Sequence, residues 1–143
     1  MRIVFSTDET TEVTDHIADH LSDLGHQVEV VRPGDPWPEV GRAVGETVAA
    51  GGADLGVVCC WTGTGVALAA NKVVGVRAAL CTDAATAAGA RRWNDANVLA
   101  LGLRLTSAPL ADEIVDAFVS TEVDPDEVEA IARVEPSDGA DPS

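Results

Sequence analysis

Basic residues are scarce in this sequence. It contains a single lysine, Lys72, and eight arginines against 24 aspartates and glutamates, which gives a formal net charge of −15. Such an acidic surface repels phosphate groups, and this argues against nucleic acids and anionic membranes as partners. We therefore expect no nucleic-acid partner and no membrane partner.

Cysteines and long apolar runs are also scarce. The three cysteines, Cys59, Cys60 and Cys81, show no Cys-x-x-Cys or zinc-ligand spacing, and an odd number of them predicts free thiols in a reducing compartment, the cytoplasm. No apolar run approaches the roughly 20 residues that a membrane span needs. The first residues, Met1-Arg2, lead into a strand-like run rather than a signal peptide.

Histidine offers little for metal binding. His16 and His20 are four residues apart on an expected helix and have acids nearby, a spacing that could bind a metal. They flank an apolar stripe on a surface helix, however, and are interpreted as solvated. We expect neither a metal ion nor another cofactor.

The sequence does contain short apolar, β-branched runs that alternate with helical patterns. Its 143 residues are 46% apolar, enough for one domain with a hydrophobic core. Strands are expected at 2–5, 27–31, 54–60, 76–80 and 97–101, and helices at 13–24, 38–51, 65–73, 83–93 and 108–120. Apolar strands separated by helices indicate a parallel sheet covered on both faces. We predict an α/β fold, a three-layer α/β/α sandwich around a five-stranded parallel Rossmann-like sheet of order 2-1-3-4-5.

The C-terminal part differs in composition from the rest. From Glu122 to Ser143 there are eight acids and one arginine, so this segment carries −7 of the net charge. It ends in a stretch of proline, serine, glycine and aspartate that is typical of a frayed tail. The chain is therefore predicted to consist of a domain at 1–121 and an acidic C-terminal segment and tail at 122–143.

Polar residues follow the first and third expected strands. In a doubly wound sheet, ligands bind at the carboxyl ends of the strands where the winding reverses, which places Asp8 and Cys60 at the mouth of one crevice. Thr62-Gly63-Thr64-Gly65 then joins a strand to a helix, where backbone N–H groups can approach an anion or a developing oxyanion. Taken alone this loop is a weak signal, and a cysteine in a buried strand is more often a packing residue.

Several segments resemble one known family. The run from Cys60 to Lys72, CWTGTGVALAANK, is similar to the CGTGxGxxxAANK signature of the ribose-5-phosphate isomerase B and galactose-6-phosphate isomerase family. The segments GVRAALC at 75–81, NDANVL at 94–99 and LGLR at 101–104 resemble further family motifs, in the same order. The resemblance covers about residues 1–121.

The resemblance implies a metal-free aldose–ketose isomerase that acts on a small carbohydrate, a sugar phosphate. By this resemblance Cys60 moves a proton between C1 and C2 of the open-chain sugar, and Thr62 helps to open the ring. The N–H groups of Gly63, Thr64 and Gly65 hold the enediolate oxygen. These roles agree with a site made of one base and oriented donors.

The resemblance also implies further substrate contacts and an oligomer. Asp8 and Asn94 match ligand-contacting positions, and Arg104 matches a phosphate-contacting arginine. Asn94 is expected from the partner subunit, because the family forms dimers with a shared active site. We therefore expect a homodimer or a higher oligomer.

The sequence departs from the family where histidines and arginines would bind the substrate. Glu9 and Trp93 each stand where the family has a histidine, and Trp61 replaces the first glycine of the loop. The family's GRHxRR segment corresponds to the acidic stretch 125–130, and at most Arg133 survives nearby.

Three interpretations of these departures stay open. The favoured one is a retained isomerase with a changed substrate, such as an unphosphorylated sugar. In the second, a paralogous subunit supplies the phosphate contacts, or Arg42, Arg91 and Arg92 replace the lost cations. In the third, the chain is a non-catalytic homologue that binds a ligand or partner.

The acidic composition predicts adaptation to concentrated salt. Short Debye lengths in salt remove the repulsion between like charges that would otherwise destabilise this surface. We expect the free energy of unfolding to rise between about 0.1 M and about 2 M KCl. Urea unfolding followed by circular dichroism at several KCl concentrations measures it, and an unchanged value would indicate an ordinary acidic protein.

Overall fold

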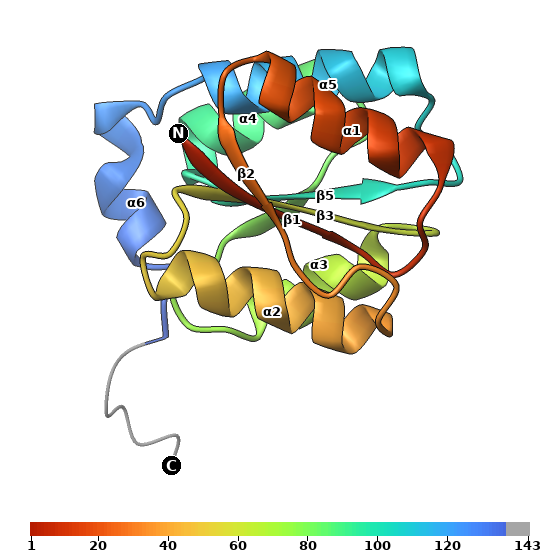
Figure 1. The fold of residues 1–143 in the computed structure, drawn as a ribbon. Helices are drawn as coiled ribbons and strands as arrows, with labels where there is room; N and C mark the ends of the chain where they lie inside the picture. The colour runs from red at the N-terminus through yellow and green to blue at the C-terminus, as the bar shows by residue number, and fades with distance from the viewer. Residues whose placement is uncertain (137–143) are drawn as a thin grey trace.

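The five expected strands form one parallel sheet. A computed structural model describes residues 1–136, and its strands are β1 (Arg2–Thr7), β2 (Gln27–Val30), β3 (Leu55–Cys60), β4 (Ala78–Leu80) and β5 (Val98–Gly102). Figure 1 shows helices on both faces of this sheet. One face carries α1 (Glu12–Asp23), α4 (Ala84–Asn94) and α5 (Ala108–Ser120), and the other carries α2 (Trp37–Ala49) and α3 (Thr64–Asn71). The predicted three-layer α/β architecture is confirmed.

Strand β3 shows why both faces need an apolar layer. All six of its residues are buried, and successive side chains point to opposite faces. Cys59 belongs to the core layer under α1, α4 and α5, whereas Cys60 belongs to the layer against α2 and α3. Cys59 is thus a packing residue, and only Cys60 lies on the side of the α3 loop.

The strand order is β2-β1-β3-β5-β4, so the predicted order 2-1-3-4-5 is wrong at its last two strands. All five residues of β5 are buried, whereas β4 has only three residues, all partly exposed. A short and partly exposed strand suits the edge of a sheet. The consequence for the site is direct, because Gly102 of β5 pairs with Cys60.

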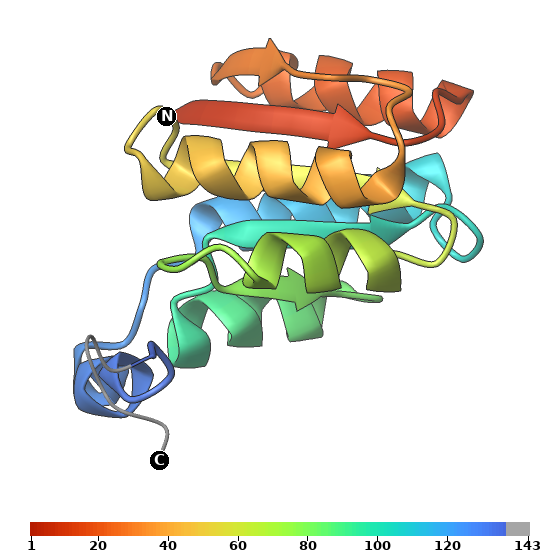
Figure 2. The ribbon, with the colours of Figure 1, turned by 90° about the horizontal axis from the view of Figure 1, so that it is seen from below.

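The acidic C-terminal segment contains two short helical elements for which the sequence analysis made no prediction. It forms a 3₁₀ turn, η1 (Pro125–Glu127), and a short helix, α6 (Val128–Ala132), which Figure 2 shows at a corner of the molecule. The Asp124 N–H donates to the Arg92 carbonyl (2.8 Å), and the Gly75 N–H donates to the Glu135 carboxylate (3.2 Å). The predicted frayed tail begins at Pro136 and otherwise lies outside the described residues, and the proposed boundary at 121 stays a prediction.

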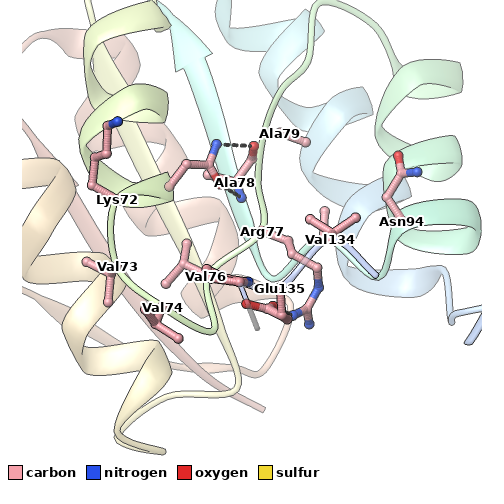
Figure 3. Close-up of a pocket in the computed structure, with 13 residues that line it drawn as sticks. Lys72, Val73, Val74, Val76, Arg77, Ala78, Ala79, Asn94, Val134 and Glu135 are labelled. Carbon is pink, nitrogen blue, oxygen red and sulfur yellow. Dashed lines mark hydrogen bonds and ion pairs between the residues drawn. The ribbon is translucent and has the colours of Figure 1, made fainter. Parts of the chain in front are cut away.

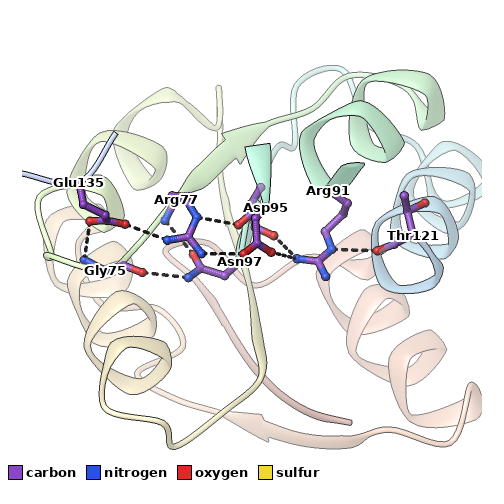
Figure 4. A network of polar contacts seen from close by, with 8 residues as sticks. Gly75, Arg77, Arg91, Asp95, Asn97, Thr121 and Glu135 are labelled. Carbon is purple, nitrogen blue, oxygen red and sulfur yellow. Dashed lines mark hydrogen bonds and ion pairs between the residues drawn. The ribbon is translucent and has the colours of Figure 1, made fainter. Parts of the chain in front are cut away.

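A polar network holds the chain together near the amino ends of the strands (Figure 4). The Arg77 guanidinium donates to the Asp95 carbonyl (2.7 Å) and to Glu135 (2.8 Å), and that of Arg91 donates to the Thr121 carbonyl (3.1 Å). Asn97 accepts a hydrogen bond from the Arg77 N–H (2.7 Å). Three residues of the family-like segments GVR and NDAN therefore have structural partners here.

The histidine pair on α1 is partly exposed and is bonded to α5. His16 Nε2 lies 2.8 Å from Asp112 Oδ1, and His20 Nε2 lies 2.7 Å from Asp116 Oδ1. The side chains of His16 and His20 are 42% and 20% exposed, so these surface histidines also have carboxylate partners that the sequence did not predict. Within residues 1–136, no group of three or more candidate ligands forms a metal site. None of the helices described is long and apolar enough to span a membrane.

Candidate active site

The candidate site is the crevice at the carboxyl ends of β1 and β3. Thr7 pairs with Cys59 across these strands, and the Asp8 N–H donates to the Cys59 carbonyl (3.3 Å). Chain connections leave β1 towards β2 and leave β3 towards the opposite edge, so the winding reverses between them. Asp8 and Cys60 therefore lie at the carboxyl ends of two neighbouring strands, and their joint role in one site stays a prediction.

The sulfur of Cys60 is held by the loop that follows it. Its Sγ accepts a hydrogen bond from the Gly63 N–H at 3.1 Å, and the residue is 5% exposed. Gly63 has a φ of +78°, and a Cβ built there would lie 2.9 Å from the Gly102 nitrogen. Only glycine fits this turn, which aims a backbone donor and the N-terminus of α3 at the sulfur.

Two threonine hydroxyls lie on the exposed side of the same loop. The Oγ1 atoms of Thr62 and Thr64 are hydrogen-bonded to each other at 2.7 Å. The Thr62 carbonyl packs against Gly102, where a Cβ would lie only 2.6 Å from that oxygen. The close approach of β5 to the loop thus depends on a second glycine.

Arg104 is brought to this loop by the turn after β5. The Leu103 N–H donates to the Cys60 carbonyl (2.9 Å), and the Arg104 N–H donates to the Trp61 carbonyl (2.8 Å). Arg104 lines a cavity of about 150 Å³ together with Trp61 and Thr62. Trp61 is 56% exposed, so an indole surface lies where the family motif has a glycine.

Asp8 lacks a partner for one carboxylate oxygen. Among buried side-chain polar atoms in the described part of the chain, its Oδ1 is the one without a hydrogen bond. Burial raises the pKa of Asp8, and the nearby charge of Glu9 raises it further. A buried acceptor without a donor is costly to the fold, and it suits a site whose ligand supplies a hydroxyl.

Asn94 is the predicted site residue that the structure does not bring to the crevice. It is the last residue of α4, and the following turn meets the start of β3, because the Gly56 N–H donates to the Asn97 carbonyl (2.9 Å). Four residues of β3, about 13 Å, separate Gly56 from Cys60. Figure 3 shows Asn94 at the rim of a pocket of about 480 Å³ at the other end of the strands.

Trp37 is not among the residues that the sequence predicts for the site. This residue begins α2, and its indole packs against Gly65, where a Cβ would lie 2.9 Å from Cδ2 and Cε3. The side chain is 45% exposed. In the sequence, Trp37 lies between two prolines at the start of a predicted helix. This pattern predicts a turn, but it does not predict that the indole contacts Gly65.

Comparison with known proteins places the chain in a family. A family model described as Ribose/Galactose Isomerase matches residues 3–135. The chain belongs to this family. The match spans the whole sheet, η1 and α6, and the family expected from the sequence motifs is confirmed.

The similar family members include curated proteins and solved structures. Ribose-5-phosphate isomerase B of Escherichia coli (strain K12) is 36% identical over 145 residues, covering 94% of this chain and 96% of that protein. Galactose-6-phosphate isomerase subunit LacB of Clostridium acetobutylicum is 42% identical over 115 residues, which cover 76% of this chain and 65% of that subunit, just under two thirds. The structure of Clostridium thermocellum ribose-5-phosphate isomerase B has a TM-score of 0.88 at 35% identity and covers 94% of this chain and 95% of its own.

A further solved member of the family was determined with a sugar phosphate. The ribose-5-phosphate isomerase B of Mycoplasma genitalium, with bound ribulose-5-phosphate, has a TM-score of 0.87 at 31% identity, with 93% of each chain covered. The expected class, an aldose–ketose isomerase, is therefore confirmed by the family.

The raised pKa of Asp8 predicts a gain in stability when its charge is removed. Because burial disfavours the carboxylate, the free energy of unfolding should fall as the pH rises from the ordinary carboxyl pKa through the raised pKa of Asp8. Below the ordinary pKa, Asp8 causes no such loss. We expect Asp8→Asn to raise the free energy of unfolding by up to about 1 kcal/mol at pH 7. The gain should shrink as the pH falls towards the ordinary carboxyl pKa of about 4.

Urea unfolding of both proteins at the two pH values measures this effect. Asp19→Asn on the exposed surface of α1 is the matched control, and its stability should change by less than about 0.5 kcal/mol. A loss of stability in Asp8→Asn at neutral pH would show that the carboxylate has a stabilising partner.

Proposed function

We propose that this chain isomerises a small sugar or sugar phosphate of the pentose class, with Cys60 as the proton-transferring base. The observation that carries the proposal is the sulfur of Cys60 at the crevice, with the Gly63 N–H 3.1 Å away. A thiolate is the active form of such a base. The N–H donor and the N-terminus of α3 place positive partial charges beside it.

The reaction is a transfer of one proton between neighbouring carbons. The Cys60 thiolate takes the proton from C2 of the open-chain aldose, and the electron pair moves into the C1–C2 bond to form an enediolate. The thiol then returns the proton to C1, and the hydroxyl proton at O2 moves to O1, which gives the ketose. Negative charge on oxygen develops in between and needs fixed donors.

The start of α3 offers those donors. The Gly63 N–H is already bonded to the sulfur, so the N–H groups of Thr64 and Gly65, in the first turn of the helix, are free of intrahelical acceptors. They are proposed to hold the enediolate oxygen. The unpartnered Oδ1 of Asp8 is proposed to accept a hydrogen bond from a sugar hydroxyl, and Thr62 to assist ring opening.

A second subunit is proposed to complete the site. Asn94 lies at the amino end of β3 in its own chain and cannot reach its own Cys60. Exposed apolar side chains lie near both ends of the edge strand β4, with Trp61 and Leu105 at one end and Trp93 and Val134 at the other. In a dimer with a two-fold axis at this edge, the amino end of β4 in one subunit would lie beside the carboxyl end of β4 in the other. Asn94 of one subunit could then reach the Cys60 site of its partner. The partner would be a second copy or a paralogous chain.

The charge around the crevice favours a substrate other than a plain pentose phosphate. Arg104 is the one cation of the predicted site, while Asp8 and Glu9 add negative charge at its mouth. The acidic segment with η1 and α6 lies at the other end of the strands, so it cannot cover the crevice of its own chain. It can act only on a partner's site. All three thiols are free, and a reducing compartment, the cytoplasm, is the proposed location.

A non-catalytic homologue is the second candidate. The observation that favours it is Trp93, which is 55% exposed and packs against Gly89 where the family resemblance expects a histidine for ring opening. An indole N–H does not exchange protons as an imidazole does. Such a protein would still bind a sugar in the crevice.

Exchange of substrate hydrogen with solvent tests the role of Cys60. Deuterium incorporation in deuterium oxide is followed by NMR for ribose 5-phosphate and for free ribose, in high salt. We expect Cys60→Ser to slow exchange at least about 100-fold. The matched control is Cys59→Ala, which removes the neighbouring thiol on the other face of β3 and should retain most of the activity. Exchange by Cys60→Ser at the wild-type rate would refute Cys60 as the base. No exchange by the wild type would support the non-catalytic candidate.

Mixing two inactive variants tests the shared site. Cys60→Ser and Asn94→Ala are each expected to be inactive. If Asn94 acts across the dimer, refolding them together in equal amounts should restore about a quarter of the wild-type activity, because half of the dimers then hold one intact site. Refolding of either variant alone is the control. Failure to recover activity would place Asn94 outside the partner's site.

A further inference from the structure

Helices α2 and α3 lie side by side on the face of the sheet away from α1 (Figure 2), and side chains from both line a groove. The two helices meet closely at Gly41, where a Cβ would lie 2.6 Å from the Ala69 Cβ. Beside this contact a cavity of about 480 Å³ opens. It shares no lining residue with the cavity at Arg104, and the proton-transfer chemistry does not use it.

The cations in this groove are unusual for so acidic a protein. Arg42 and Lys72 both line it, together with one acid, Glu46. Four other cations form ion pairs within 4 Å, namely Arg2, Arg32, Arg77 and Arg91. Across residues 1–136, Arg42 and Lys72 have no such pair, and neither have Arg92, Arg104 and Arg133. The groove therefore holds two cations and one acid on a chain of net charge −15, and this local excess of positive charge favours an anion there.

Apolar surface adjoins these cations. The indole of Trp37 packs on Gly65 on one side and is 45% exposed, and Leu68 on α3 is 63% exposed. Both line the groove. An indole held by packing on one side and open on another offers a surface for stacking a planar ring.

We propose that this groove binds a phosphate ester that carries a planar ring, a ligand of the nucleoside monophosphate class. The phosphate would pair with the Arg42 guanidinium and the Lys72 ammonium through charge-assisted hydrogen bonds. The ring would stack on Trp37 beside Leu68. The groove adjoins the Cys60 crevice at Gly65, on which Trp37 packs, but Asp8, Cys60 and Arg104 do not line it. The proposal does not depend on the proposed isomerase activity.

Calorimetric titration with AMP tests the proposal. At low salt, about 0.05 M, where the Debye length is long, we expect saturable binding of AMP that is tighter than that of adenosine or inorganic phosphate alone. The double variant Arg42→Gln/Lys72→Gln should weaken AMP binding at least about tenfold. Trp37→Leu should remove the advantage of AMP over inorganic phosphate.

Two controls separate this site from others. Arg2→Gln removes a cation at the far end of β1, and AMP binding should not change. Saturating ribose 5-phosphate should leave the AMP isotherm unaltered, because the crevice lies elsewhere. No saturable AMP binding, an unchanged affinity in the double variant, or competition by ribose 5-phosphate would each overturn the proposal.

Discussion

The pairing of β3 with β5 is the contact on which the candidate site depends. Both strands are buried on both faces, and their register puts Gly102 opposite Cys60. The turn after β5 then donates backbone hydrogen bonds to the carbonyls of Cys60 and Trp61. Because Gly102 has no side chain, the loop after β3 can lie against it and turn the Gly63 N–H back onto the sulfur. Packing in the sheet thus sets the position of the Cys60 sulfur, the proposed base.

The charged residues differ in their surroundings, and two groups of them lie at proposed ligand sites. Most acids lie on the surface, where concentrated salt would screen them. The buried Oδ1 of Asp8 has no hydrogen-bond partner and is proposed to accept a hydrogen bond from a ligand. Arg42 and Lys72 in the α2–α3 groove are cations on an otherwise acidic surface. Both features lie at proposed ligand sites.

The family-like segments divide into chemical and structural parts. In NDAN, Asp95 and Asn97 bond to Arg77 and hold the turn after α4, whereas Asn94 is proposed to contact a substrate. Arg77, from the second segment, links this turn to Glu135 in the C-terminal part. Some residues of a family motif are therefore shared because they stabilise the fold, and only others are candidates for contact with a substrate. The positions that depart from the family, Glu9, Trp61 and Trp93, are all exposed.

Periodicity and motifs in the sequence determined the architecture, the family, and the position of Asp8 and Cys60 at the carboxyl ends of two neighbouring strands, because apolar strands and the ends of parallel strands obey general rules. The order of β4 and β5 could not be predicted from the sequence, because both segments are apolar runs. In the tertiary structure the longer β5 is fully buried inside the sheet, and the shorter, partly exposed β4 forms its edge. Only the folded chain showed α6, the bonds of His16 and His20 to α5, and Trp37 on Gly65, which join residues far apart in sequence. Asn94 shows the difference. The sequence identified its motif, but only the fold showed that Asn94 lies far from Cys60 of the same chain.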